Sequence, residues 1–360
     1  MPLSSVRDWI SRHRVELGLS LRIGAAALVT YALGTVLGLA QTYWAVFTTV
    51  VVMQASVGGS MKASLDRIVG TIGGAAWGVA VAVTVPHRGV VSTGFALAVT
   101  LLPLAVVAAF RPAYRVAAIT GTIVLLGRFG EIGVVDAALD RVFEIVLGSV
   151  VALVVAVTVT PTRAHGLLGG AGREALAEMA ELCQALFADL AIAADLPTVL
   201  GFHERIRRAL GRAVVAADEA ARERRSLISD APDPAPLVRS IRRLSHDFVI
   251  AARARAAPLP APVAERLGPP LAALSGALSA DLRGIGAALA ARSAPPVPGS
   301  DGFDGFQQAM AQMRLDGITR ALSGEEVERV FGLSFALEQI RRNMDDLANH
   351  ARDLALPGRR

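Results

Sequence analysis

The chain has 360 residues, of which 53% are hydrophobic and 19% charged, and its formal net charge is +5. Soluble domains carry about 25% charged residues, and here the charges are uneven: residues 1–160 hold 11 basic and 7 acidic residues, whereas 161–360 hold 25 and 24. The first part therefore has a membrane composition and the second a soluble one. The sequence has no basic stripe with interleaved aromatic residues, which excludes a nucleic-acid-binding surface.

Residues 1–20 combine charges with apolar residues at helical spacing. The charged positions are Arg7, Asp8, Arg12, Arg14 and Glu16, and the apolar ones include Trp9, Ile10 and Leu17. A cleaved signal peptide has a continuous apolar run instead. The pattern predicts an amphipathic helix that lies in the membrane interface.

Six apolar runs follow, and each is a candidate membrane-spanning helix. A span needs about 20 mostly apolar residues. The runs cover residues 21–40, 42–57, 68–85, 90–110, 116–127 and 142–160. The second and fifth are short and rich in threonine. We predict a transmembrane domain over 21–160 with six helices.

The basic residues predict the orientation of these helices. With six spans and a cytoplasmic N-terminus, nine basic residues lie inside, namely Arg7, Arg12, Arg14, Arg22, Lys62, Arg67, Arg111, Arg115 and Arg163. Three lie outside, namely Arg88, Arg128 and Arg141. Because cytoplasmic loops are enriched in Lys and Arg, we expect a multi-pass protein of the cell's inner (plasma) membrane with both termini in the cytoplasm.

An internal repeat supports six spans. Shifted by 74 residues, ASLDRIVGTIGG (63–74) aligns with AALDRVFEIVLG (137–148), and VAVTV (81–85) aligns with an identical VAVTV (155–159). Each copy would contain three spans, and because three is odd the copies would be inverted relative to each other. Inverted 3+3 repeats are common in transporters, with the substrate pathway between the copies.

Glycines recur at every fourth position on two predicted spans. Gly70, Gly74 and Gly78 share a face of the third span, and Gly34 and Gly38 share a face of the first. Small residues let helix backbones approach closely in lipid. We expect these five glycines to pack helices together.

The segment SVGGSMKAS (56–64), between the second and third spans, contains the only lysine of the chain. Its adjacent glycines predict a tight or unwound turn, which is tolerated at membrane depth only where protein or water lines it. Lys62 and Arg67 would then lie at the inner mouth. They are either cytoplasmic anchors or part of an electropositive vestibule that attracts anions.

QTYWAVFTTVVVMQASVGGSMKASLDRIVGTIGGAAWGV (41–79), YRVAAITGTIVLLG (114–127) and ALDRVFEIVLGSVVALVVA (138–156) together resemble the fusaric-acid-resistance-like (FUSC) family of membrane transporters. That family includes bacterial aromatic acid exporters and is similar to plant aluminium-activated malate channels. The resemblance covers about residues 20–160 and is most specific from Tyr43 to Gly74. It implies six spans, a helical cytoplasmic domain and movement of organic anions. Many larger exporters of this kind carry a second membrane block, so a pathway that needs two blocks implies a homodimer here.

An anionic substrate needs positive charge or hydrogen-bond donors inside the membrane. The candidate pathway residues are Gln54, Ser56, Lys62, Arg67, Arg111, Arg115, Arg141 and Glu144. Glu144 is the one carboxylate expected inside a span. It either relays protons or forms a salt bridge with Arg141, three residues earlier.

Pro161 ends the last predicted span, and HGLLGGAG (165–172) predicts a hinge over 161–172. Amphipathic helices without a strand pattern predict an all-helical cytoplasmic domain over 173–360. The helices cover 173–194, 198–229, 236–257, 263–292, 304–322 and 325–355. The last opens with a capping box formed by Ser323 and Glu326.

Two of these helices carry apolar residues at alternating spacings of three and four. One row runs from Leu267 to Leu289, and the other from Val330 to Leu354. Such rows build seams between helices. The seams lie either inside one subunit's bundle or at a subunit interface.

The fold expected is all-α, a six-helix transmembrane bundle followed by a cytoplasmic helical bundle. We expect a transporter or channel for small organic anions, such as aromatic carboxylates leaving the cell, that works as a homodimer in the lipid bilayer. The alternative is a membrane-anchored scaffold or sensor whose cytoplasmic domain binds a partner. The histidines have no metal-ligand spacing and no nucleophile motif is present, so neither an enzyme nor a cofactor is expected.

Overall fold

The computed structural model describes residues 13–127, 133–159, 162–226 and 229–355. Every regular element in these ranges is a helix, which confirms the all-α fold class. The chain divides into two compact units, Met1–Arg163 and Ala164–Arg360. We call these ranges unit 1 and unit 2.

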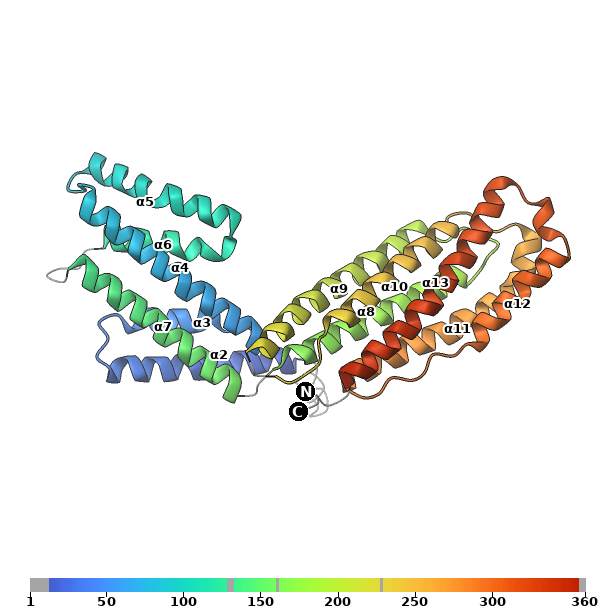
Figure 1. Ribbon diagram of the computed structural model, residues 1–360, viewed down its shortest axis with the longest axis horizontal. Coiled ribbons are helices and arrows are strands. Elements are labelled where there is room, and N and C mark those ends of the chain that lie inside the picture. The colour runs from blue at the N-terminus through green and yellow to red at the C-terminus, as the bar shows by residue number, and fades with distance from the viewer. Residues whose placement is uncertain (1–12, 128–132, 160–161, 227–228, 356–360) are drawn as a thin grey trace, which may run out of the picture. The chain divides into compact units, whose positions relative to one another are not determined.

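Unit 1 consists of antiparallel helices. Its described elements are α2 (Arg14–Val36), α3 (Thr42–Val52), α4 (Val57–Thr84), α5 (Val90–Phe110), η1 (Pro112–Tyr114), α6 (Arg115–Leu126) and α7 (Val134–Thr158). Consecutive α-helices alternate in direction, and α4 packs antiparallel to α7 (Figure 1). This is the pattern of directions that an inverted repeat predicts.

Helix lengths in unit 1 repeat in the order long, short, long. They are 23, 11 and 28 residues for α2, α3 and α4, and 21, 12 and 25 for α5, α6 and α7. In the described residues, four helices (α2, α4, α5 and α7) are long and apolar enough to cross a membrane. At about 1.5 Å per residue, α3 and α6 cover little more than half of the roughly 30 Å hydrocarbon core. The structure therefore confirms four of the six predicted spans by length.

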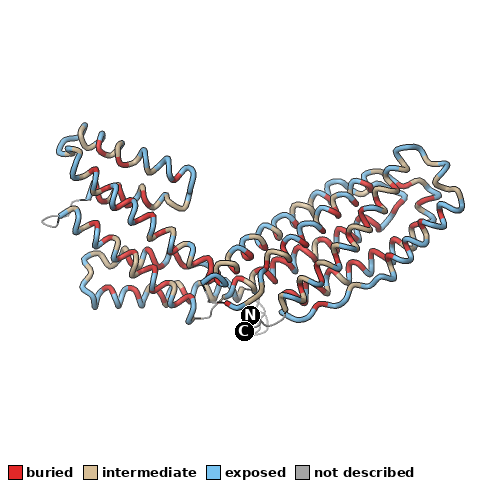
Figure 2. Tube along the Cα trace, in the orientation of Figure 1, coloured by how far each residue is buried: buried red, intermediate tan, exposed pale blue. Residues whose placement is uncertain are grey.

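The outer surface of unit 1 is apolar. α5 exposes Val90, Phe95, Leu102 and Phe110, the last to 83%, and the helix is pale blue along most of its length in Figure 2. A soluble protein rarely leaves such a large apolar patch exposed. A helix that is apolar all round is typical of a membrane span.

Two predicted boundaries in unit 1 are wrong. α2 starts at Arg14, so residues 14–20 continue into the first membrane helix instead of forming a separate interfacial helix; residues 1–12 lie outside the described part. α4 starts at Val57, so the predicted turn at Gly58 and Gly59 is helical. The cause is a strong N-cap: the Ser56 hydroxyl oxygen accepts a hydrogen bond from the Gly59 N–H at 2.8 Å.

The break between α3 and α4, residues 53–56, has protein partners for its backbone. Nη2 of Arg22 donates to the Ala55 carbonyl oxygen at 2.9 Å, and the Gln54 N–H donates to the Ser60 hydroxyl at 2.9 Å. Irregular backbone is tolerated at membrane depth where such partners exist. Arg22, counted above among the basic residues of the cytoplasmic side, is fully buried and stabilises this break.

Glycines bring α4 close to α6. A Cβ placed on Gly74 would overlap the carbonyl oxygen of Ala117, and one on Gly78 would lie 3.0 Å from the Cα of Gly121. Gly78 thus faces another glycine across the interface. Close backbone contact of this kind is a main source of helix association in lipid.

The other predicted packing glycines differ among themselves. A Cβ on Gly34 would overlap the Thr42 side chain, and one on Gly70 would be in ordinary contact with Val116 at 3.5 Å. Gly38 has φ +67° and nothing within 4 Å of its Cβ position. The packing role predicted for Gly38 is wrong, because its left-handed backbone forms the turn after α2.

We expect Gly74→Ala to lower the melting temperature of the detergent-purified protein and Gly73→Ala to leave it unchanged. The added methyl group at position 74 would push against the α6 backbone, and overpacking costs about 1–3 kcal/mol. Gly73 is exposed on the same helix, with no atom within 4 Å of its Cβ position. Thermal unfolding followed by tryptophan fluorescence tests the pair. Equal melting temperatures would contradict the close approach of α4 and α6.

Unit 2 is a bundle of long helices around one apolar core. Its described elements are α8 (Ala164–Phe187), α9 (Leu196–Arg225), α10 (Ala235–Ala254), α11 (Ala261–Ala291), α12 (Asp301–Leu315), η2 (Ile318–Ala321) and α13 (Gly324–Ala355). Buried residues line the facing sides of these helices (Figure 2). The capping box before α13 is confirmed, since the Ser323 N–H donates to Glu326 Oε2 at 2.8 Å and the Glu326 N–H donates to Ser323 Oγ at 3.4 Å.

Both predicted apolar rows lie in the core of unit 2. All row residues from Leu267 to Leu289 on α11, and those from Val330 to Ala351 on α13, are buried there. The rows therefore pack inside one bundle, which is the first of the two alternatives. Cys183 lies in the same core, and burial raises the pKa of its thiol to about 11, so it remains a neutral thiol.

The predicted hinge over 161–172 is wrong from Ala164 onward, because α8 starts there. The Ala164 N–H donates to both carboxylate oxygens of Glu223, at 3.1 and 3.3 Å. A Cβ on Gly169 would lie 2.5 Å from the carbonyl oxygen of Leu289 on α11. The glycines of this segment permit close helix packing and do not form a linker. Pro161 lies outside the described residues.

Candidate functional site

The start of α3 carries aromatic side chains held by Gln41. Oε1 of Gln41 accepts hydrogen bonds from Trp44 Nε1 at 2.9 Å and from the Tyr43 hydroxyl at 3.1 Å. One turn along α3, Phe47 packs edge-on against Trp44, with ring centroids 5.9 Å apart. The two rings form a short aromatic row along the helix.

Arg141 of α7 stacks on this row. Its Cζ lies 3.4 Å from the centroid of the Trp44 ring, and the residue is only 5% exposed. Nε and Nη1 are buried and have no hydrogen-bond partner in the described residues. A buried charge without a partner is costly, and stacking on an aromatic ring offsets only part of that cost. The Arg141 guanidinium thus keeps two buried donor atoms for which the described residues supply no acceptor.

Glu144 follows Arg141 by one turn and is 3% exposed. Its Oε1 accepts a hydrogen bond from the backbone N–H of Gln41 at 3.1 Å. The alternative prediction, a salt bridge with Arg141, is wrong: no such ion pair forms within the described ranges. The N–H groups that precede a helix have no partner inside it, and Glu144 supplies one for α3.

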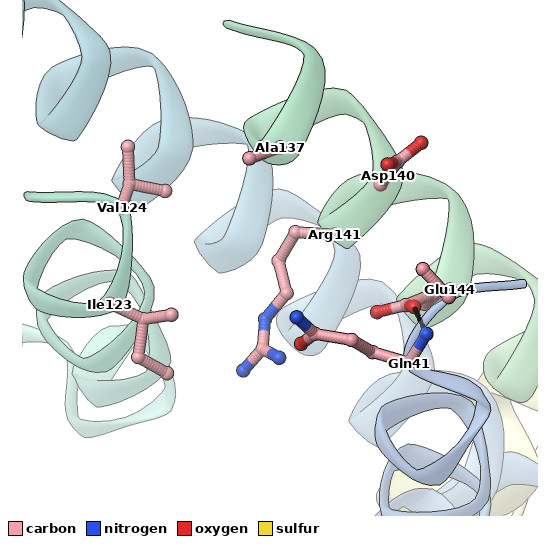
Figure 3. A pocket seen from close by; sticks show the side chains of 8 residues that line it. Gln41, Ile123, Val124, Ala137, Asp140, Arg141 and Glu144 are labelled. Carbon is pink, nitrogen blue, oxygen red and sulfur yellow. Dashed lines mark hydrogen bonds between the residues drawn. The ribbon is translucent and has the colours of Figure 1, made fainter. Parts of the chain in front are cut away.

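A pocket lies where the start of α3 and the end of α6 meet α7. It has about 450 Å³ of empty space, part of it open to the surroundings. Arg141 points into the space between Gln41 and Ile123, while the side chain of Asp140, which also lines the pocket, points away from Arg141 (Figure 3). Ile123 and Val124 of α6 supply an apolar wall. The pocket thus combines a guanidinium, an amide and the carboxylates of Asp140 and Glu144 with an apolar side.

Arg67 of α4 contacts the second ring of the aromatic row. Its Cζ lies 5.4 Å from the Phe47 centroid, and the residue is 8% exposed. Its positive charge is close enough to act on that of Arg141. Arg67 and Arg141 are equivalent residues of the 74-residue repeat, so α3 contacts one arginine from each copy.

A comparison with family models gives one match. Residues 27–155 match the family described as fusaric acid resistance protein-like. Residues 27–155 form a fusaric acid resistance protein-like domain. This confirms the predicted family. No curated protein matches the chain. Together with the four helices that are long and apolar enough to cross a membrane, this match indicates a multi-pass membrane protein with a role in transport or efflux.

Several predicted pathway residues of the fusaric acid resistance protein-like domain lie away from the pocket. Nζ of Lys62 is exposed and forms an ion pair with Asp66 at 2.7 Å. Arg111 is exposed at the end of α5, and Arg115 is exposed as the first residue of α6. None of these three basic residues lines the pocket.

The two neutral candidates support the fold of the domain. Ser56 caps α4 and is 1% exposed. Gln54 is exposed, and its Nε2 donates to the Val51 carbonyl oxygen at 3.2 Å. Both lie at the break between α3 and α4, away from Arg141 and Glu144.

The sequence pattern does not single out Gln41 or Phe47. The available signal is local: in QTYWAVF, an amide precedes two aromatic residues one helical turn apart. A second signal is the position of α3 and α6, each the short middle helix of its copy. Short or interrupted segments at corresponding positions of two repeats indicate the binding site of a transporter, and the pocket is lined by Ile123 and Val124 of α6 and by Gln41, the residue just before α3.

Proposed function

We propose that the protein moves small organic anions across the membrane and that Arg141 binds the anion on its way. The observation that carries the proposal is the buried guanidinium of Arg141, in which Nε and Nη1 lack partners in the described part of the chain. Ionisable residues inside membrane bundles mark substrate and ion pathways. An arginine with free N–H groups binds carboxylates and similar anions through paired hydrogen bonds.

The pocket suits a carboxylate attached to an apolar ring. The anionic group would meet Arg141, and the ring would lie against Ile123 and Val124. Aromatic carboxylates combine both features, and efflux is the activity that the family indicates.

The proposal includes a homodimer in the plasma membrane, with both termini in the cytoplasm. The basic residues other than the buried Arg22, Arg67 and Arg141 still favour one side of the membrane, which supports this orientation. Because α3 and α6 are too short to cross the membrane alone, a second copy would help to enclose a continuous pathway. Movement of the anion requires neither a covalent step nor a cofactor.

Flux into liposomes that contain the purified protein tests this function. The probes are radiolabelled benzoate and benzenesulfonate; the second stays ionised at all working pH values and cannot cross lipid as a neutral acid. We expect saturable, protein-dependent flux of both, with and without a pH gradient, and none of benzylamine, a cation of similar size. Absence of anion flux under every condition would contradict the proposal and favour a membrane-anchored scaffold or sensor.

A further inference from the structure

We propose that Arg67 forms a second anion-binding position, so that the pathway holds two anions in series along α3. The ligand is a single negatively charged group, either the acidic group of the transported organic anion or a halide. This inference rests on the proposed function, because it concerns the same pathway. It adds a site whose side chains come from α4 instead of α7.

Two hydroxyl groups flank Arg67 on one face of α4. Ser64 lies three residues before it and Thr71 four residues after it, which places all three side chains in one row. Ser64 and Thr71 are each 1% exposed. Ser64 Oγ, Arg67 Nε and Thr71 Oγ1 are all buried without a hydrogen-bond partner within the described ranges.

Such a row is unusual, because the large majority of buried polar atoms in proteins have a partner. Three adjacent unpaired groups indicate a ligand that the protein itself does not supply. A guanidinium can only donate hydrogen bonds, and a hydroxyl can also donate. The ligand that fits all three is therefore an acceptor, and the positive charge favours an anion.

No nearby acid of the described structure neutralises Arg67. Asp66, its neighbour, forms its ion pair with Lys62 at 2.7 Å. Glu144 accepts its hydrogen bond from the Gln41 N–H, and Asp140 is exposed on α7. Arg67 and Arg141 thus place two positive charges beside α3 for one buried carboxylate.

The aromatic row of α3 connects the two positions. Trp44 contacts Arg141 and Phe47 contacts Arg67, and the two rings are 5.9 Å apart. Anions held at adjacent positions repel each other, so entry of a second anion weakens binding of the first. Channels use this effect to combine selective binding with rapid release.

Binding stoichiometry tests the second position. Detergent-purified protein is dialysed to equilibrium against radiolabelled benzenesulfonate in chloride-free buffer. We expect two equivalents per chain for the parent, one for Arg67→Gln and one for Arg141→Gln. Arg67→Lys, which keeps the charge, should restore the second equivalent with weaker affinity. Arg88→Gln removes an exposed charge from the loop between α4 and α5 and should retain two.

The outcomes separate the two proposals. Suppose that the parent binds one equivalent of benzenesulfonate, and that this equivalent is retained in Arg67→Gln and lost in Arg141→Gln. This result overturns the second position and leaves the proposed function intact. No binding and no flux for the parent overturns both. Competition with saturating chloride identifies the ligand of Arg67. If chloride displaces one equivalent from the parent and none from Arg67→Gln, that ligand is a halide. Retention of both equivalents in chloride assigns the organic anion. Size-exclusion profiles and melting temperatures equal to the parent's establish that each variant is folded.

Discussion

Arg141→Gln is expected to reduce benzenesulfonate flux at low substrate concentration by roughly 10- to 100-fold. Hydrogen bonds to charged groups contribute about 1.5–3 kcal/mol, and each 1.4 kcal/mol corresponds to a factor of about ten. Arg141 is the buried cation of the pocket, and its guanidinium points into the space between Gln41 and Ile123 (Figure 3). Glutamine occupies similar space without the charge, so the loss would come from the anion contact.

Two further variants separate charge from geometry. Arg141→Lys keeps the positive charge but loses the planar group that stacks on Trp44 and forms paired hydrogen bonds, so its flux should lie between those of the parent and Arg141→Gln. Arg88→Gln, which removes an exposed charge elsewhere in unit 1, should match the parent. Liposome flux at equal reconstituted protein measures all three. If Arg141→Gln carried anions at the parent rate, Arg141 would not be the binding group.

Hydropathy and periodicity predict the long helices well and the interruptions poorly. α5 (Val90–Phe110) coincides with its predicted run because it is continuously apolar. The predicted span over 42–57 is shorter in the structure, because the N-cap at Ser56 starts a new helix and leaves residues 53–56 outside both. A cap is a single hydrogen bond, and an average over about 20 residues does not detect it.

The repeat predicts the equivalence of Arg67 and Arg141, but counting charges does not predict their surroundings. A count of basic residues treats every arginine as a marker of an aqueous loop, and it assigns Arg141 to an outer loop. The structure buries Arg141 on Trp44 and Arg67 beside Phe47. The contact of Arg141 with Trp44 joins helices that are distant in sequence, so it depends on packing that a single sequence does not specify.

Glu144 connects the anion position to the start of α3. Its Oε1 accepts the Gln41 N–H, and the charged groups that act on it are Arg141 and Asp140 of its own helix. An anion bound to Arg141 would place a second negative charge beside this carboxylate. Nearby negative charge favours the protonated form of an acid. By linkage, proton binding to Glu144 would then strengthen anion binding by the same factor.

Glu144→Gln is therefore expected to make anion flux independent of pH. In the parent, downhill benzenesulfonate flux should rise as the pH falls, because protonation removes the charge that opposes the anion. Glutamine is permanently neutral and keeps an oxygen that can accept the Gln41 N–H, so the variant should show the parent's acidic-pH rate at every pH.

With the membrane voltage clamped, a pH gradient should concentrate the anion on the alkaline side for the parent and not for the variant. Asp136→Asn is the matched control, since Asp136 is an exposed acid in the first turn of the same helix and does not line the pocket, and it should retain the parent's pH profile. A pH profile and a gradient response unchanged in Glu144→Gln would remove Glu144 from any role in proton coupling.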